Sequence, residues 1–115
     1  MNPRNIGREN EEAKIQRAII MELRMNCWFV KETHGNLYQS GLPDLFCCHT
    51  RYGHRWCEVK KPVGYAFTPA QLETFPLMCA HGSGVWVATS HIGIQELFMR
   101  PFNWFVYLQN ARAIR

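Results

Sequence analysis

Apolar residues recur at a helical period near the start of the chain. Within residues 11–25, Ile15, Ile19 and Leu23 fall on one face, which predicts an amphipathic helix. Asn10 precedes this stretch and is predicted to cap the helix. Two glutamates follow it in the first turn, where the helix dipole favours acidic side chains.

Three short apolar runs further along the chain predict strands. Residues 27–30 are expected to form a buried first strand that extends to about Thr33. Residues 44–50 are expected to form a central strand, and residues 85–88 an interior one. A turn through residues 52–54 would return the chain after the central strand.

Local signals in the second half of the chain mark two further helices. Thr68 followed by Pro69 is a strong helix start, and Gly82 is a suitable stop. Pro76 lies deep in this helix and is expected to kink it. Ser90 is predicted to cap another helix that ends before the next proline. Because helices and strands alternate, we expect an α/β fold with a mixed sheet.

Two acids and a lysine are predicted to share one side of this sheet. Alternate residues of a strand point the same way, so Glu58 and Lys60 would face together while Val59 points into the core. Asp44 begins the preceding strand, and the turn would bring Glu58 alongside it. The two carboxylates and the carbonyl of Val59 are oxygen donors suited to Mg²⁺ or Mn²⁺. Such a site can perform phosphodiester hydrolysis, with Lys60 either activating the water or acting as a fixed charge.

Helical residues are candidates to join this site. Glu12 and Gln16 lie on the core-facing stripe of the first helix, where an acid is costly unless it is solvated, paired or near a metal. The alternative is that Glu12 reaches water from a frayed helix end. Gln71 lies in the first turn of the Thr68-capped helix. It can point back toward the end of the strand that carries Glu58 and Lys60, or it is an ordinary surface glutamine.

Three short motifs together resemble the PD-(D/E)xK nuclease superfamily and, within it, the VRR-NUC domain family. They are Pro43-Asp44, Glu58-Val59-Lys60 and Thr68-Pro69-Ala70-Gln71, and the resemblance covers residues 9–99 or so. The resemblance implies a restriction-endonuclease-like α-β-β-β-α-β core and hydrolysis of DNA. It also implies a divalent metal, Mg²⁺ or Mn²⁺, held by Asp44 and Glu58.

The resemblance also implies roles for residues outside the strands. The family has a helical glutamate and glutamine that match Glu12 and Gln16, and a glutamine near the metal and lysine that matches Gln71. Stand-alone domains of this family of phage type are similar to Holliday junction resolvases. The implied activity is therefore a metal-dependent DNA endonuclease that selects branched DNA such as four-way junctions.

Contacts to the substrate are expected from scattered polar and basic residues. Gly41 would allow the backbone to approach a DNA phosphate closely. The other candidates for substrate contacts or for lining the approach to the site are Gln16, Lys31, Arg51, Lys61, His34, Asn36 and Tyr38.

Composition is consistent with a folded, DNA-binding domain but does not identify one. The net charge is +4 and the pI is about 8.9, which suits a polyanionic partner. Hydrophobic residues make up 47% and charged residues 19%, so the chain should fold. We expect one domain over residues 1–115, with a core at about 9–99 and a C-terminal extension at 101–115. The polar start and the absence of a long apolar run predict a soluble, cytoplasmic protein without a membrane partner.

Two other classes of protein compete with this interpretation. A non-catalytic DNA-binding module could retain the fold, although it would be expected to lose one of the three central residues, and all three are present. A structural zinc site is the second alternative, because Cys47, Cys48, His49, His54 and Cys57 cluster in the sequence. Adjacent strand residues face opposite sides, so Cys47 and Cys48 could not easily share a metal. The five cysteines are odd in number, lack Cys-x-x-Cys spacing and lie in apolar patterns, so we expect buried thiols instead.

The tail at 101–115 is unusually apolar for a surface segment. Cutting a junction symmetrically needs two equivalent centres, which a two-fold homodimer would supply. The tail could be covered by the partner subunit, or it could fold back onto its own sheet. The apolar side chains concerned are Phe102, Trp104, Phe105, Tyr107 and Leu108.

Overall fold

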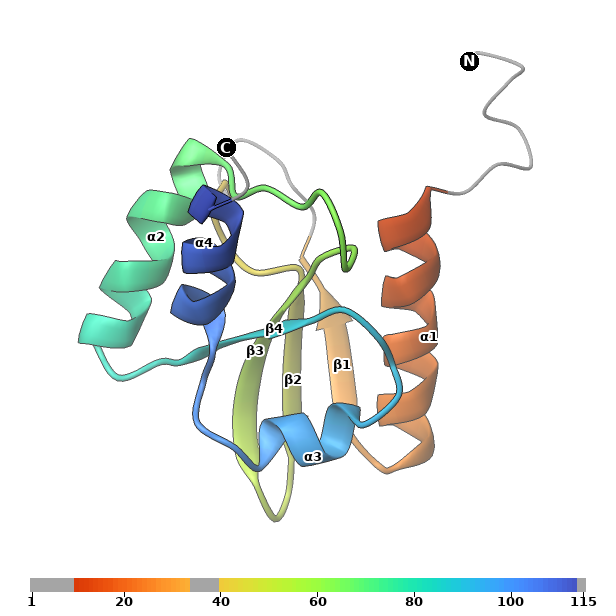
Figure 1. Cartoon of the computed structure of the whole chain (residues 1–115). Coiled ribbons are helices and arrows are strands. Elements are labelled where there is room, and N and C mark those ends of the chain that lie inside the picture. Colours follow the sequence, from red (N-terminus) through yellow and green to blue (C-terminus); the bar gives the residue numbers. More distant parts are fainter. Residues whose placement is uncertain (1–9, 34–39, 114–115) are drawn as a thin grey trace.

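The computed structural model describes residues 10–33 and 40–113, in which helices and strands alternate (Figure 1). The predicted helix at 11–25 is confirmed, and the Asn10 side chain caps it by accepting a hydrogen bond from the N–H of Ala13 at 2.7 Å. In chain order the elements are α1 (Glu11–Met25), β1 (Phe29–Glu32), β2 (Leu45–His49), β3 (Gly53–Val59), α2 (Pro69–Ala80), β4 (Val85–Ala88), α3 (Ile94–Phe98) and α4 (Trp104–Ala113).

The four strands form one mixed sheet in the order β1-β2-β3-β4. β1 pairs antiparallel with β2, and β2 pairs antiparallel with β3 through a short turn at residues 50–52. β3 and β4 are parallel, and α2 makes the crossover between them. The expected α/β class and the α-β-β-β-α-β order are therefore confirmed.

Helices cover the two faces of the sheet unequally. α1 and α3 pack on one face, over a core that includes Leu45, Cys57 and Val59. α2 and α4 pack on the other face, over Val85 and Val87 of β4, and lie on the opposite side of the molecule from α1 (Figure 1). The second face is thus covered at β4, while its β1 and β2 region has exposed side chains.

The first strand starts at Phe29, so the prediction that it starts at Cys27 is wrong. Cys27 has a left-handed backbone with φ of 69°. Its N–H donates to the carbonyl of Arg24 at 3.2 Å, and the N–H of Trp28 donates to that of Leu23 at 3.0 Å. These two bonds form a Schellman motif, which satisfies the last carbonyls of α1 before the strand begins.

The cysteines differ in exposure. Cys47 and Cys57 are fully buried, as predicted for structural thiols. Cys48 and Cys79 are only partly buried. Cys27 is exposed, which corrects the expectation that all five thiols are buried, because the residue that follows a helix end lies outside the core.

The strand at 85–88 is confirmed, but it lies at an edge of the sheet rather than in the interior. Its apolar sequence reflects the helices on both of its faces. On its free edge, the side chain of Asn103 pairs with Val87 as a strand would. Asn103 Oδ1 accepts from the Val87 N–H at 2.7 Å, and Asn103 Nδ2 donates to the Val87 carbonyl at 3.2 Å.

The signals for α2 are confirmed. Thr68 and Gln71 form a reciprocal capping box, and Pro69 occupies the first turn. Gly82 has φ of 94° and ends the helix with hydrogen bonds back to its last turn. α2 continues through Pro76, which lies on its exposed side, where water can bond the carbonyl that proline leaves unpaired.

The predicted helix after Ser90 is shorter than expected and has a different cap. α3 begins at Ile94, and Gly93 is its N-cap with φ of 75°. Ser90 instead caps the preceding turn, where its Oγ accepts a hydrogen bond from the N–H of Ile92 at 3.0 Å. A serine hydroxyl stabilises such turns as readily as it stabilises helix starts, so the local sequence did not distinguish them.

The apolar tail packs within its own chain. Trp104 is 7% exposed and contacts Phe75 of α2, with ring centroids 5.9 Å apart. Tyr107 and Leu108 pack against the same cluster. Of the five apolar side chains, Phe105 is the one that remains largely exposed, at 46%. This arrangement matches the alternative in which the tail folds back.

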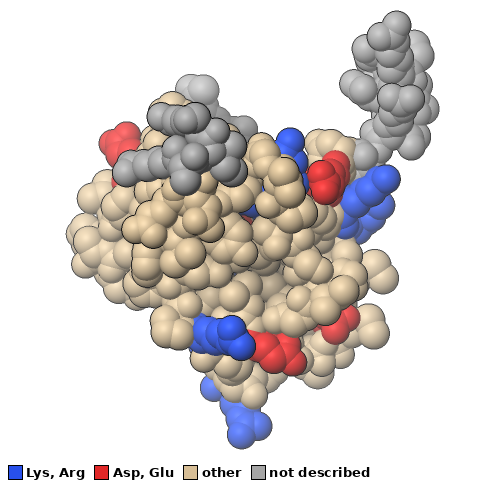
Figure 2. Space-filling view, viewed as in Figure 1, with Lys and Arg blue, Asp and Glu red and all other residues tan. Residues whose placement is uncertain are grey.

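Charged side chains are unevenly distributed over the surface. Figure 2 shows a face that is largely uncharged, with acidic and basic groups gathered near the start of α1 and around the lower end of the sheet. No helix in the described ranges is both long and apolar enough to span a lipid bilayer.

Candidate active centre

Asp44 and Glu58 lie side by side at the upper end of β2 and β3. Leu45 pairs with Cys57, so the next residues outward, Asp44 and Glu58, come into register on the other face. Asp44 Oδ2 accepts a hydrogen bond from the Val59 N–H at 2.7 Å, and the Asp44 N–H donates to Glu58 Oε1 at 3.2 Å. These two bonds fix both carboxylates to the backbone of the neighbouring strand.

Lys60 lies on the same face as Glu58, as the strand period predicts. Its side chain is almost fully buried, and Nζ is 3.1 Å from Glu58 Oε2. Nζ also donates to the Ala66 carbonyl at 2.7 Å and to Gln71 Oε1 at 3.2 Å. The Phe67 ring lies beneath it, with its centroid 4.8 Å from Nζ. Three acceptors match the three protons of an ammonium group.

Gln71 joins the charged groups at the end of β3 to α2. Its Nε2 donates to Glu58 Oε2 at 2.8 Å, while its Oε1 accepts from Lys60 Nζ and from the Thr68 N–H. The capping box of α2 therefore orients the glutamine that holds both the acid and the lysine. Gln71 is 9% exposed, so it is part of the centre rather than a surface residue.

The two acids resist simultaneous ionisation. Burial, followed by repulsion from Asp44, raises the pKa of Glu58 from an ordinary 4.5 to about 8, although Lys60 opposes this shift. Burial also raises the pKa of Asp44, partly offset by the hydrogen bond from Val59. Close carboxylates with raised pKa values gain stability from a cation between them.

The metal-free protein is expected to lose stability as pH rises. The folded protein keeps a proton on Glu58 that the unfolded chain releases near pH 4.5. The stabilising contribution is thus complete below about pH 4.5 and lost by about pH 8. We expect thermal unfolding in chelator to show a falling midpoint across this interval, and the fall to be smaller in Asp44→Asn.

The matched control for this pH effect is Glu73→Gln, which removes an exposed carboxylate from α2. Its midpoint should change with pH as in the unmodified protein. If stability rose between pH 5 and pH 8 in the unmodified protein, or if Asp44→Asn had an equal slope, burial beside Asp44 would not be the cause of the raised pKa.

The donor set fits a hard divalent cation. Mg²⁺ in proteins is often bound by one or two carboxylates, with water and substrate phosphate completing the octahedron. Asp44 and Glu58 provide the acids. The N–H of Val59 points toward Asp44, and a strand residue's carbonyl points to the same side as its N–H, so this carbonyl also faces the centre. Within the described part of the chain, no group of three or more His, Cys, Asp or Glu residues is placed to hold a metal by itself.

Glu12 and Lys61 border a hollow beside this centre. The hollow measures about 330 Å³ and is also lined by Asn10 and Glu11 at the start of α1. Glu12 is partly buried, and its charge contributes to the raised pKa of Asp44 as the smallest of several causes. The structure therefore brings Glu12 to the vicinity of the acids, whereas the more exposed Glu11 lies on the flank.

Other candidate residues have no direct contact with the acids. Gln16 donates to Glu32 Oε1 at 3.0 Å on the α1 side of the sheet. Lys31 is exposed on the opposite face, beside Phe46. Arg51 lies in the turn between β2 and β3, at the far end of the strands from Asp44. His34, Asn36 and Tyr38 fall outside the described residues.

Gly41 approaches α2 rather than open space. Its φ is +87°, and a Cβ built there would lie 2.6 Å from the Ala70 carbonyl oxygen. The close backbone contact that the sequence suggested is therefore made with the first turns of α2. This contact fixes the segment leading to Asp44 against the helix that carries Gln71.

Gly41→Ala is expected to destabilise the fold more than Gly53→Ala. Both glycines have positive φ, so either alanine should cost about 1–2 kcal/mol in backbone strain. Gly53 has no atom within 4 Å of the added Cβ, whereas Gly41 also meets the α2 backbone. Urea unfolding should show at least about 1 kcal/mol of additional loss for Gly41→Ala. Equal losses would mean that the loop moves freely away from α2.

Three groups at the centre were not anticipated from the sequence. The Ala66 carbonyl and the Phe67 ring hold Lys60, although the 63–67 segment resembled an ordinary loop. Thr33 Oγ1 donates to the Pro43 carbonyl at 2.6 Å and so anchors the residue before Asp44. The sequence signal for the Lys60 contact was Phe67, the aromatic residue just before the helix cap, because cations favour aromatic faces.

The cysteine and histidine cluster does not converge. Cys47 points into the α1-side core, while Cys48 points to the other face, where it pairs with His54. His49 Nδ1 accepts a hydrogen bond from the N–H of Arg51 at 3.0 Å. Among the described residues, the zinc interpretation therefore has no set of ligands.

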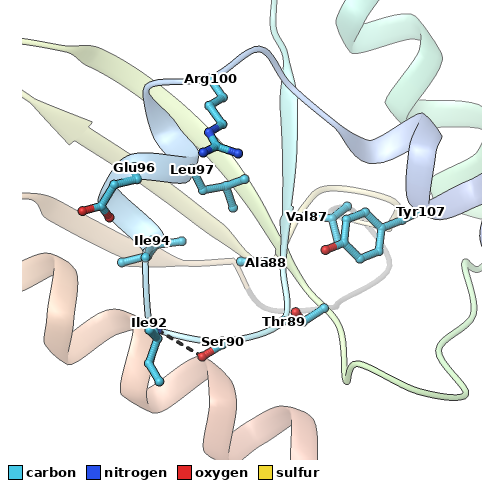
Figure 3. A pocket seen from close by; sticks show the side chains of 11 residues that line it. Val87, Ala88, Thr89, Ser90, Ile92, Ile94, Glu96, Leu97, Arg100 and Tyr107 are labelled. Atoms are coloured by element: carbon cyan, nitrogen blue, oxygen red, sulfur yellow. Dashed lines mark hydrogen bonds between the residues drawn. The ribbon is translucent and has the colours of Figure 1, made fainter.

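A separate hollow of about 310 Å³ lies past the end of β4, between α3 and α4 (Figure 3). Its polar lining includes Thr89, Ser90, Glu96, Arg100 and Tyr107. Glu96 is the one carboxylate in this lining, so the hollow lacks the paired acids found at the end of β2 and β3.

Comparisons with known proteins support the fold. A structure described as a VRR_NUC domain matches with a TM-score of 0.67 and 23% sequence identity, covering 80% of this chain and 98% of that one. No protein-family model matches the sequence, and no curated protein does. The chain therefore has the fold of a VRR_NUC domain.

Proposed function

We propose that this protein is a divalent-metal-dependent endonuclease that hydrolyses phosphodiester bonds of DNA. The observation that carries the proposal is the buried network of Asp44, Glu58, Lys60 and Gln71 at the end of two paired strands. Burying such charges costs stability, and buried acids with raised pKa values cluster at functional sites. The VRR_NUC fold supports the same activity.

Asp44, Glu58 and the Val59 carbonyl would hold Mg²⁺ or Mn²⁺, with Glu12 contributing through water. When bound, the ion would polarise the phosphate and lower the pKa of the attacking water. Gln71 is a positioning residue, since it fixes Glu58 and Lys60 relative to each other. Lys61 would contact phosphate at the rim of the adjoining hollow.

Lys60 would act as a fixed positive charge on the phosphoryl oxygens. Its Nζ has three acceptors, an arrangement that suits the protonated ammonium and leaves no lone pair to accept a proton. A general base would need the neutral amine, which has only two hydrogens for these three acceptors. The geometry therefore favours electrostatic stabilisation of the transition state.

We extend the proposal to branched DNA cut by a homodimer, because symmetric cleavage of a four-way junction requires two equivalent centres. The contact between subunits would not come from the packed part of the tail. Phe105 and Val106 remain exposed on α4 and are available for it. Light scattering of the double variant Phe105→Ser and Val106→Ser tests this contact. A dimer that persists in the variant would show that the interface lies elsewhere.

Incubation with a panel of substrates tests the activity. Linear duplex, single-stranded, flap and four-way-junction DNA, with matched RNA, are incubated in Mg²⁺, Mn²⁺ or chelator. Cleavage that requires a divalent ion and is fastest on the junction supports the proposal. Binding without cleavage in any metal would instead identify a non-catalytic DNA-binding module.

A further inference from the structure

One part of the sheet has none of the described helices over it and carries mainly aromatic side chains. In the antiparallel register, Phe29 lies beside Cys48 and Lys31 beside Phe46, and these residues all point away from α1. On β3, His54 lies beside Cys48 and Trp56 lies beside Phe46, so both rows of side chains continue across the third strand. We call this surface the open face, and its members are Phe29, Lys31, Phe46, Cys48, His54 and Trp56.

The open face is accessible. Phe29 is 57% exposed, Lys31 and His54 are exposed, and Phe46 and Trp56 are partly exposed. Phe46 packs against Trp56, with ring centroids 5.1 Å apart. Phe46 and Trp56 therefore form a packed aromatic pair with Lys31 in the same row, and Phe29 and His54 lie in the next row.

This surface leads directly to the active centre. The row of Lys31, Phe46 and Trp56 is followed, two residues further along each strand, by the row that contains Asp44 and Glu58. Two residues of a strand span about 7 Å, so the aromatic row lies next to the acids on the same face. A nucleic-acid strand whose phosphate reaches the acids would have its neighbouring nucleotides over the open face.

The charge of the open face distinguishes between possible partners. Its six members include no acid, and Glu32 of β1 points to the other face, where it bonds Gln16. A second copy docked here would place Lys31 in an interface with no acid from the same surface to pair with it, which is costly. A phosphate backbone supplies the missing negative charge, and nucleobases stack on exposed aromatic rings.

We propose that the open face binds unpaired nucleotides of single-stranded DNA beside the scissile phosphate, with bases stacked on its rings and Lys31 on the backbone. This inference rests on the proposed nuclease function and names the part of the substrate that the protein recognises. A duplex keeps its bases stacked inside, so it would not use the rings. The open face would therefore direct cleavage to sites next to single strands, such as flaps or opened junction arms.

Binding in chelator tests this separately from cleavage. Fluorescence anisotropy is measured with a labelled oligothymidine and with a duplex of equal length, for the intact chain and the variants Phe29→Ala, Trp56→Ala and Lys31→Ala. Each aromatic variant should weaken single-strand binding by roughly five- to a hundredfold and change duplex binding by no more than about twofold. Phe29 is mostly exposed, so its variant should fold even if the Trp56 variant does not.

Matched controls come from α1, on the opposite face of the sheet. Met21→Ala removes an exposed apolar side chain from this helix, and Lys14→Ala an exposed lysine. Neither should affect oligothymidine binding. Unchanged single-strand affinity in Phe29→Ala, or an equal loss on duplex, would overturn the proposal, as would light scattering that shows a dimer converted to monomer by this substitution.

Failure of the open-face proposal can be distinguished from failure of the proposed nuclease function. If the protein binds oligothymidine through the open face but never cleaves, the nuclease function fails and the binding surface stands. If it cleaves flaps and junctions equally well with Phe29→Ala and Lys31→Ala, the surface fails and the nuclease function stands.

Discussion

Asp44→Asn is expected to lower DNA cleavage by at least about a thousandfold while the fold remains intact. Losing a metal ligand removes several kcal/mol of transition-state stabilisation. The asparagine can still accept the hydrogen bond that Val59 donates to Asp44, so the strands should stay paired. The measurements are single-turnover cleavage in Mn²⁺, calorimetric titration with Mn²⁺ and circular dichroism.

The control for Asp44→Asn is Glu73→Gln, which removes one negative charge from an exposed position on α2. It should cleave DNA and bind Mn²⁺ normally. Substantial cleavage by Asp44→Asn, or activity of the unmodified protein in excess chelator, would show that the paired acids are not the metal site.

The second large effect is expected for Lys60→Met. Methionine keeps much of the buried side-chain volume but removes the charge, so turnover should fall by about a hundredfold or more. DNA affinity should change little, because Nζ is held inside the protein by Glu58, Gln71 and the Ala66 carbonyl. Comparing kcat with the Kd for DNA separates these two effects.

Lys61, the neighbouring lysine, is expected to affect DNA affinity rather than turnover. Lys61 is more accessible than Lys60 and borders the hollow beside the centre. Lys61→Ala should weaken DNA binding and reduce its salt dependence, with little change in kcat. If Lys60→Met lost affinity in proportion to its rate, Lys60 would be a phosphate contact rather than a transition-state charge.

The carboxylate pair was predictable because its geometry depends on local rules. A hairpin brings the start of one strand beside the end of the next, and period 2 places Glu58 and Lys60 on one face. Thr68 similarly determined the start of α2 and thus the position of Gln71. In each case a short stretch of sequence was sufficient.

Features that depend on distant parts of the chain were harder to predict. β4 looks like an interior strand because helices cover both of its faces, yet strand order is not encoded in its own residues. Cys27 follows α1 in the left-handed conformation usual for glycine. Because a cysteine does not signal a helix end, its apolar neighbours suggested a strand. The Ala66 carbonyl contributes to the centre through its backbone, which side-chain identity does not reveal.

The pairing of Asn103 with Val87 limits how copies of this domain can assemble. An exposed sheet edge is a template on which another chain can add a strand, and such growth leads to shared sheets or fibres. On the β4 side, any incoming strand must first displace the Asn103 amide, which already occupies the N–H and carbonyl of Val87. The other edge, β1, is short and carries the charged Lys31 and Glu32. Assembly through the side-chain surfaces of this domain is therefore favoured over continuation of its sheet.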